Sequence, residues 1–106
     1  MPRFMVTGNY VGEGVKGLLK EGGSSRRAAV QKAVEGLGGK LESFYYAFGE
    51  YDVFGVADMP DNVTAAAFSL MVNATGTVNV KTTVLLTAEE FDQVTKKVVD
   101  YRAPGQ

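Results

Sequence analysis

The sequence predicts an α+β fold, and three observations lead to this prediction. Four segments carry the alternating or aromatic-rich pattern of β-strands, and two longer segments between them carry apolar residues at helical spacing. Glycine pairs, prolines and capping residues separate these segments at short intervals, and no long linker divides the chain. With 106 residues, the sequence indicates one domain of ordinary size, covering 1–106.

The first part of the chain predicts two strands with helical sequence between them. Residues 3–10 alternate as a strand, and residues 11–21 form a helical piece that stops at a glycine pair. Ser24 or Ser25 is expected to cap a second helical run, which another glycine pair ends. Residues 40–48 are rich in aromatics and predict the second strand. The stripe of the second helical run is Val30, Ala33, Val34 and Leu37.

The middle of the chain predicts a tight hairpin followed by a long helix. Gly49-Glu50 suits a type II′ turn, in which the first central position needs a positive φ, before a strand over residues 51–58. Asp61 is placed to cap a helix that runs through Asn73, and residues 78–86 alternate as the fourth strand. The expected buried stripe of this helix is Val63, Ala66, Ala67, Leu70, Met71 and Ala74.

The last segment predicts a terminal helix. Thr87 and Glu90 match a capping box, in which each side chain accepts a hydrogen bond from the other residue's backbone. We expect this helix to pack through Phe91, Val94 and Val98, and residues 103–106 to form a disordered tail.

The resulting order, βαββαβ plus a terminal helix, is the ferredoxin-like arrangement, with both long helices on one face of an antiparallel sheet. The second face of this sheet also carries apolar residues, because Leu41 and Tyr45 are expected on one side of their strand and Phe54 and Val56 share a side of theirs. A large bare apolar face favours burial against a second copy. The sequence therefore predicts a homodimer or higher oligomer, with the chain itself as partner through the sheet face.

The composition excludes several chemistries. The chain has no cysteine and no histidine, so disulfides, thiolate nucleophiles, cysteine-ligated zinc, iron–sulfur clusters and a Ser-His-Asp triad are ruled out. No metal or cofactor is expected. A net charge of −1 with interspersed signs gives no basic stripe for nucleic acid. Neither a signal peptide nor a membrane-length apolar run is present, so no membrane partner is expected and cytoplasmic is the expected location.

One glycine pattern resembles a dinucleotide site. Gly12, Gly14 and Gly17 fit G-x-G-x-x-G between a predicted strand and a helix. Glu13 would place a carboxylate in the phosphate cradle, and no second βαβ unit follows to hold the rest of the nucleotide. We therefore interpret the pattern as a consequence of the high glycine content.

The stretch from Gly49 to Asp52 is the main candidate site. A carboxylate at Asp52 among aromatic side chains would have a raised pKa and act as general acid or base. The alternative, ranked ahead of it, is a structural role in which Asp52 bonds nearby backbone N–H groups or an arginine. Arg26 lies in the first turn of a helix, where the macrodipole disfavours a cation. This favours an anionic partner such as Asp52 or a ligand carboxylate, and the alternative of equal weight is a solvated helix face.

A resemblance to the GYD domain family follows from an ordered set of motifs. Gly49-Glu50-Tyr51-Asp52 carries the Gly-x-Tyr-Asp pattern of that family, after Leu37-Gly38-Gly39-Lys40-Leu41 and before Met59-Pro60-Asp61. The resemblance covers about residues 4–91 and implies a small bacterial protein with a ferredoxin-like fold of the dimeric α+β barrel kind. It implies no assigned activity. Asp58 departs from the family, in which glutamate is common at this position.

Three functions fit these observations. In the first, the chain binds a small molecule in an aromatic pocket between sheet and helices, with Tyr10, Arg26, Tyr45, Tyr51 and Asp52 as ligand-binding candidates. The second, by analogy of fold alone, is a cofactor-free monooxygenase or isomerase with Asp52 or a tyrosine as acid/base. The third is a structural or regulatory protein without a ligand.

Overall fold

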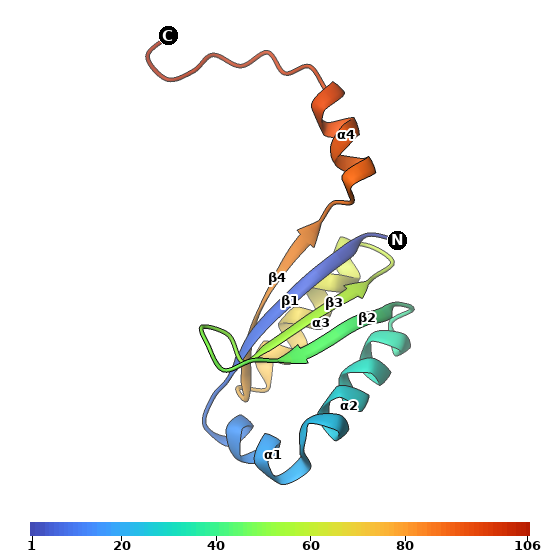
Figure 1. The fold of residues 1–106 in the computed structure, drawn as a ribbon, viewed down its shortest axis with the longest axis vertical. Coiled ribbons are helices and arrows are strands. Elements are labelled where there is room, and N and C mark those ends of the chain that lie inside the picture. Colours follow the sequence, from blue (N-terminus) through green and yellow to red (C-terminus); the bar gives the residue numbers. More distant parts are fainter.

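The computed structural model describes residues 1–106 and contains one four-stranded antiparallel sheet (Figure 1). Its strand order, β2-β3-β1-β4, together with the order of helices and strands along the chain, confirms the α+β class and the ferredoxin-like arrangement. The strands are β1 (Arg3–Tyr10), β2 (Lys40–Tyr46), β3 (Val53–Asp58) and β4 (Val78–Leu85). The helices are α1 (Glu13–Glu21), α2 (Gly23–Gly36), α3 (Asn62–Ala74) and α4 (Ala88–Lys96).

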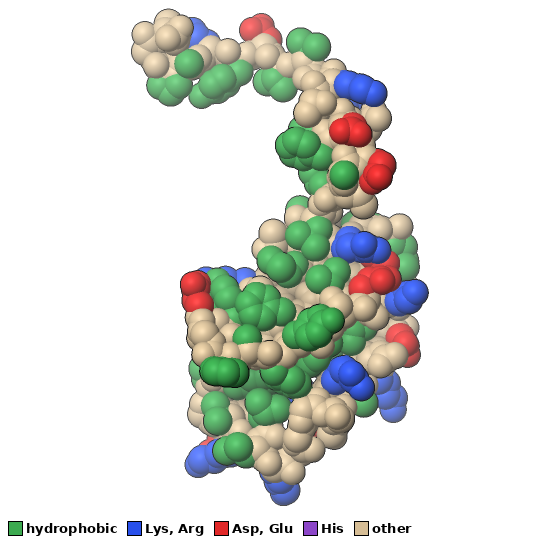
Figure 2. All heavy atoms as spheres, in the orientation of Figure 1, with side chains coloured by type: hydrophobic (Ala, Val, Ile, Leu, Met, Phe, Trp, Pro, Cys, Tyr) green, Lys and Arg blue, Asp and Glu red, His purple; other side chains and the backbone are tan.

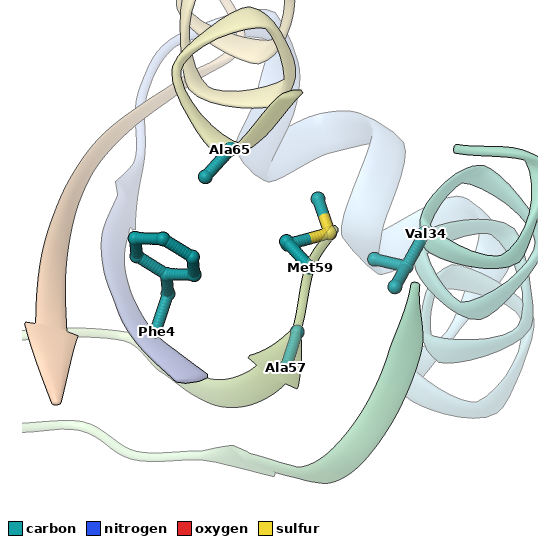
Figure 3. Close-up of a cluster of buried hydrophobic side chains, with 5 residues drawn as sticks. All are labelled: Phe4, Val34, Ala57, Met59 and Ala65. Atoms are coloured by element: carbon teal, nitrogen blue, oxygen red, sulfur yellow. The ribbon is translucent and has the colours of Figure 1, made fainter. Parts of the chain in front are cut away.

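The hydrophobic core lies where α2 and α3 cover the same face of the sheet. Its five buried side chains come from β1, α2, β3, the segment after β3, and α3 (Figure 3). Val34 of α2 is the most deeply buried, with 1% of its surface exposed. The core is small, so the loss of any one of these side chains removes a large part of the packing that joins helices to sheet. The five are Phe4, Val34, Ala57, Met59 and Ala65.

The two N-terminal helices differ from the prediction at their junction. Neither serine caps α2, because Gly22, with a φ of 83°, both ends α1 and precedes α2, so that the two serines fall inside the first turn. Of the three glycines in the pattern near the start of α1, Gly14 has a packing role: a Cβ on Gly14 would lie 1.7 Å from the carbonyl oxygen of Thr77. Gly14 therefore allows α1 to approach the start of β4 closely.

The predicted two-residue hairpin turn is wrong. Strand β2 ends at Tyr46 and β3 begins at Val53, and the loop between them is closed by the Ala47 N–H, which donates to the Asp52 carbonyl at 2.8 Å. Gly49 does not have a positive φ, so a type II′ turn is absent. The loop is longer because the backbone N–H of Asp52 donates to the Gly8 carbonyl of β1, which fixes Asp52 against a strand remote in sequence.

Strand β2 contains an irregularity that changes its faces. The register with β3 shifts between Leu41 and Ser43, as a β-bulge does. Both Leu41 and Phe44 therefore lie on the face that the helices cover. Their partners on β3 are Ala57 and Gly55. The expectation that Leu41 and Tyr45 share a face is wrong for this reason.

Helix α3 begins as predicted but presents another face to the sheet. The Asp61 carboxylate accepts a hydrogen bond from the Thr64 N–H at 2.8 Å, which confirms the N-cap. The inward residues are Ala65, Phe68, Ser69 and Val72, whereas Val63, Leu70 and Met71 are 70–79% exposed. Apolar residues occur on both sides of the helix, so the helical period alone could not identify its buried side.

The side chain of Asn73 fixes α3 to the edge of the sheet. Its amide donates to the Val80 carbonyl at 3.3 Å and accepts from the Val80 N–H at 2.8 Å. The backbone N–H and C=O of Val80, which point away from β1, are thus paired with a side chain of α3.

The C-terminal helix stands apart from the rest of the molecule (Figure 1). The capping box is confirmed, since both hydrogen bonds between Thr87 and Glu90 are present. The predicted packing is wrong: Phe91, Val94 and Val98 are 54%, 47% and 97% exposed, and α4 has no buried residue. No helix in the molecule combines the length and apolar content that a membrane crossing requires.

Candidate ligand-binding site

An apolar cavity lies between the sheet and helices α2 and α3. Its volume is about 90 Å³, and 15 of its 18 lining residues are hydrophobic. The core side chains in Figure 3 close one end, and residues from the end of β1 and the start of α2 border the other. The wall of the cavity includes Val6, Val30, Phe44, Val53, Phe68 and Val72.

A glycine on β3 contributes to this space. Gly55 lies opposite Val6 on β1 and Phe44 on β2, with its missing side chain on the cavity side. A Cβ at Gly55 would lie 3.5 Å from Phe44 Cδ2, which is ordinary van der Waals contact. The glycine therefore leaves room that an alanine would fill, and the sequence contained no pattern that identified this role.

Two polar side chains lie at one end of the cavity, and a third, Thr82, lies opposite Val6 and is paired with Ser69. Tyr10 and Arg26 line it, and Arg26 is the one charged residue among the lining residues. Tyr46 lies near both: its hydroxyl donates to the Gly23 carbonyl at 2.9 Å. Burial, with a smaller contribution from the neighbouring Tyr10, raises the pKa of Tyr46 to about 12. Tyr46 therefore remains a neutral donor at physiological pH.

Arg26 has a weak partner within the chain. Its Nη1 lies 3.6 Å from Glu21 Oε2, and both side chains are partly exposed. Such a pair contributes little to stability, at most about 1 kcal/mol. The guanidinium is thus able to exchange Glu21 for a carboxylate that it can bind in bidentate geometry.

Asp52 has a structural connection to this site. Its Oδ2 accepts a hydrogen bond at 3.0 Å from the backbone N–H of Tyr10, and its own N–H pairs with Gly8. These two bonds hold the end of β1, which carries the Tyr10 side chain. Asp52 thus bonds a backbone N–H group, as in the structural role described for it in the sequence analysis. It does not line the cavity.

The other two predicted ligand-binding residues lie on the opposite face of the sheet. Tyr45 is 69% exposed, and Tyr51 packs edge-on against Phe54 with ring centroids 5.8 Å apart. The structure therefore brings together Tyr10 and Arg26 and separates them from Tyr45 and Tyr51. Tyr46 was not among the predicted ligand-binding residues, although its spacing of two from Phe44 places both rings on one face. The two rings pack edge-on there, with their centroids 5.3 Å apart.

These features define a class of small α+β domain with a single-sheet core, a partly enclosed apolar cavity and one cation at its border. The GYD domain model matches residues 4–95, and the chain belongs to the GYD domain family. Among solved structures, the chain is similar to a protein of unknown function from Nitrosomonas europaea, with 20% sequence identity and a TM-score of 0.42. That match covers 82% of this chain and 91% of the other. The comparison with curated proteins gives no match.

Proposed function

We propose that this chain binds a small molecule that has a short apolar group and an acidic head, with the apolar group in the cavity and the head at Arg26. The observation that carries the proposal is an apolar cavity with one charged residue in its lining. An apolar wall stabilises a hydrocarbon group by about 0.8 kcal/mol for each buried CH₂. The guanidinium of Arg26 and the phenol of Tyr10, both of which line the cavity, supply donors for a carboxylate.

The cavity volume limits the size of the apolar group. A cavity of about 150 Å³ accommodates benzene, and this cavity measures about 90 Å³. An aliphatic group of roughly three to five carbons fits that space by the same scale. We therefore expect short-chain or branched carboxylates rather than fatty acids or polycyclic molecules.

A carboxylate series tests the proposal. Linear acids from acetate to octanoate and the matching alcohols are titrated into the protein, and chemical shifts of cavity methyl groups give the affinities. We expect affinity to rise with chain length and then to fall when the cavity is full, with the acids preferred over the alcohols.

The matched variants for this series are Arg26→Gln and Arg27→Gln. Arg26→Gln should remove the preference for acids, about tenfold, because a hydrogen bond to a charged group contributes about 1.5–3 kcal/mol and this one is partly exposed. Arg27, which is exposed and does not line the cavity, serves as the control. An unchanged preference in Arg26→Gln, or no response of cavity methyl groups to any acid, would contradict the proposal.

We also propose that two copies associate through the outer face of the sheet. Hydrophobic side chains gather over the strands at the centre of Figure 2. On the outer face, Met5 lies opposite Val56 and Tyr45 lies opposite Phe54, so the apolar side chains are contiguous. We expect Tyr45→Ser to weaken association in sedimentation equilibrium, and a wild-type chain that stays monomeric at high micromolar concentration would contradict this.

A further inference from the structure

The outward face of α3 is an unpartnered apolar stripe. The side chains that point away from the sheet are all hydrophobic, and Val63, Leu70 and Met71 keep 79%, 73% and 70% of their surface exposed. They recur at the spacing at which two helices pack against each other. A monomer rarely leaves such a face in water. The stripe is Val63, Ala66, Ala67, Leu70, Met71 and Ala74.

The same chain carries a second unpartnered apolar surface, the C-terminal arm, which we define as residues 86–106. Every residue of the arm is exposed. Within α4, Phe91 and Val94 lie on one side, whereas Glu89, Asp92 and Gln93 lie elsewhere around the helix. A nine-residue helix is marginal in water by itself, so α4 depends on packing that its own domain does not supply.

The shape of the molecule shows how far the arm departs from the domain. The radius of gyration is 16.8 Å, whereas a compact chain of this length has about 13 Å. The longest dimension is 56 Å; α4 extends along it, and the chain beyond α4 turns across it (Figures 1 and 2).

Helix α4 cannot cover the α3 stripe of its own chain. Strand β4 ends at Leu85 and α4 begins at Ala88, so three Cα steps of about 3.6 Å, about 11 Å in all, separate sheet from helix. A helix on the outward side of α3 has its axis on the order of 20 Å from the sheet, because α3, about 10–12 Å in diameter, lies between them. The connector is too short for that position.

The outer face of the sheet beside β4 is also a poor site for the arm of the same chain. The residues of β4 on that face include Asn79, Lys81 and Thr83, which are polar and exposed. An amphipathic helix docked there would leave Phe91 against polar groups.

We propose that the C-terminal arm of one copy packs on the α3 stripe of a second copy, with Phe91 and Val94 of α4 against Leu70 and its neighbours. Both surfaces belong to one chain, so a two-fold axis satisfies both at once, which makes the contact self-complementary. This contact uses neither the ligand cavity nor the outer face of the sheet, so it forms or fails independently of the proposals above.

Mixed-isotope NMR on the full chain tests this contact directly. The chain has no cysteine, so Lys97→Cys gives a single attachment point for a nitroxide label. Lys97→Cys chain that carries the nitroxide and contains no ¹⁵N is mixed with ¹⁵N-labelled wild-type chain. We expect broadening of the α3 amides in the ¹⁵N-labelled copy. Broadening only when label and ¹⁵N lie on one chain, or none at all, would overturn the proposal.

A pair of exposed leucines gives a matched test of the stripe. Leu70→Ser should reduce the intermolecular broadening severalfold, whereas Leu19→Ser, at an 81% exposed leucine on α1, should leave it unchanged. Phe91→Ser changes the arm alone: Phe91 is 54% exposed and lies outside the hydrophobic core, so the domain should stay folded while the intermolecular broadening falls. Equal broadening in all three variants would overturn the proposal.

Discussion

Gly55→Ala should make the protein more stable while it reduces ligand binding. The new methyl group would have its nearest neighbours at 3.5, 3.7 and 4.0 Å, and Gly55 does not need a positive φ. Replacing glycine by alanine at a compatible position stabilises by about 0.4–1 kcal/mol through the unfolded state. Burial of one methyl group adds about 0.8 kcal/mol, so the expected gain in the free energy of unfolding is about 1–2 kcal/mol.

Urea unfolding followed by circular dichroism measures this gain, and heating should show a midpoint higher by about 4–8 °C for each kcal/mol. The control is Gly8→Ala, because a Cβ at Gly8 would lie 3.0–3.2 Å from Val80, Asn79 and Val53, including a backbone oxygen. We expect Gly8→Ala to lose stability. If Gly55→Ala is destabilised as well, the space beside Gly55 does not exist; if it is stabilised but binds butyrate as tightly as wild type, that space is not the ligand site.

Three further predictions follow from the hydrogen bonds and pKa shifts. Asp52→Ala should lower the free energy of unfolding by about 1.5–3 kcal/mol, because it leaves the partly buried Tyr10 N–H without its charged acceptor, and Asp52→Asn should lower it less; equal losses in urea titrations would contradict this. The hydrogen bond that Arg3 donates to Asp58, 2.9 Å long, lowers the pKa of Asp58 below 3.8. The ionised carboxylate therefore stabilises the fold above that pH, and this contribution is lost as the pH falls through the folded-state pKa. Asp58→Asn should show a shallower loss of stability in acid. The pKa of Tyr46 is raised from 10.0 to about 12, so the unfolded chain ionises first and stability should fall between those pH values, an effect that Tyr46→Phe should remove in alkaline unfolding curves.

The elements that depend on local sequence were predictable. The four strands and the caps at Asp61 and Thr87 follow from alternation and from hydrogen bonds that reach only three residues along the chain. The family match likewise agrees with motifs spread along the chain. These features need no knowledge of what packs on them.

Features that depend on distant partners were predicted poorly. The hairpin loop follows from bonds between Asp52 and β1, 42 residues away, which a local turn rule does not include. The buried face of α3 was misassigned because the outward face is the more apolar one, whereas the inward face includes Ser69, which is paired with Thr82 of β4. Tyr10 and Arg26 border one cavity because β1 and α2 meet there, whereas Tyr45 and Tyr51 follow the alternation of the sheet to its other side.

The two hydrogen bonds between Asn73 and Val80 have a consequence for how the sheet can grow at its β4 edge. An exposed edge strand is a template on which further chains add by backbone hydrogen bonding. On β4, the amide of Asn73 already occupies both backbone groups of Val80 that an incoming strand would use. Growth of the sheet beyond β4 is therefore blocked near the middle of the strand, so that β2, the other edge strand, is the side on which a further strand could add.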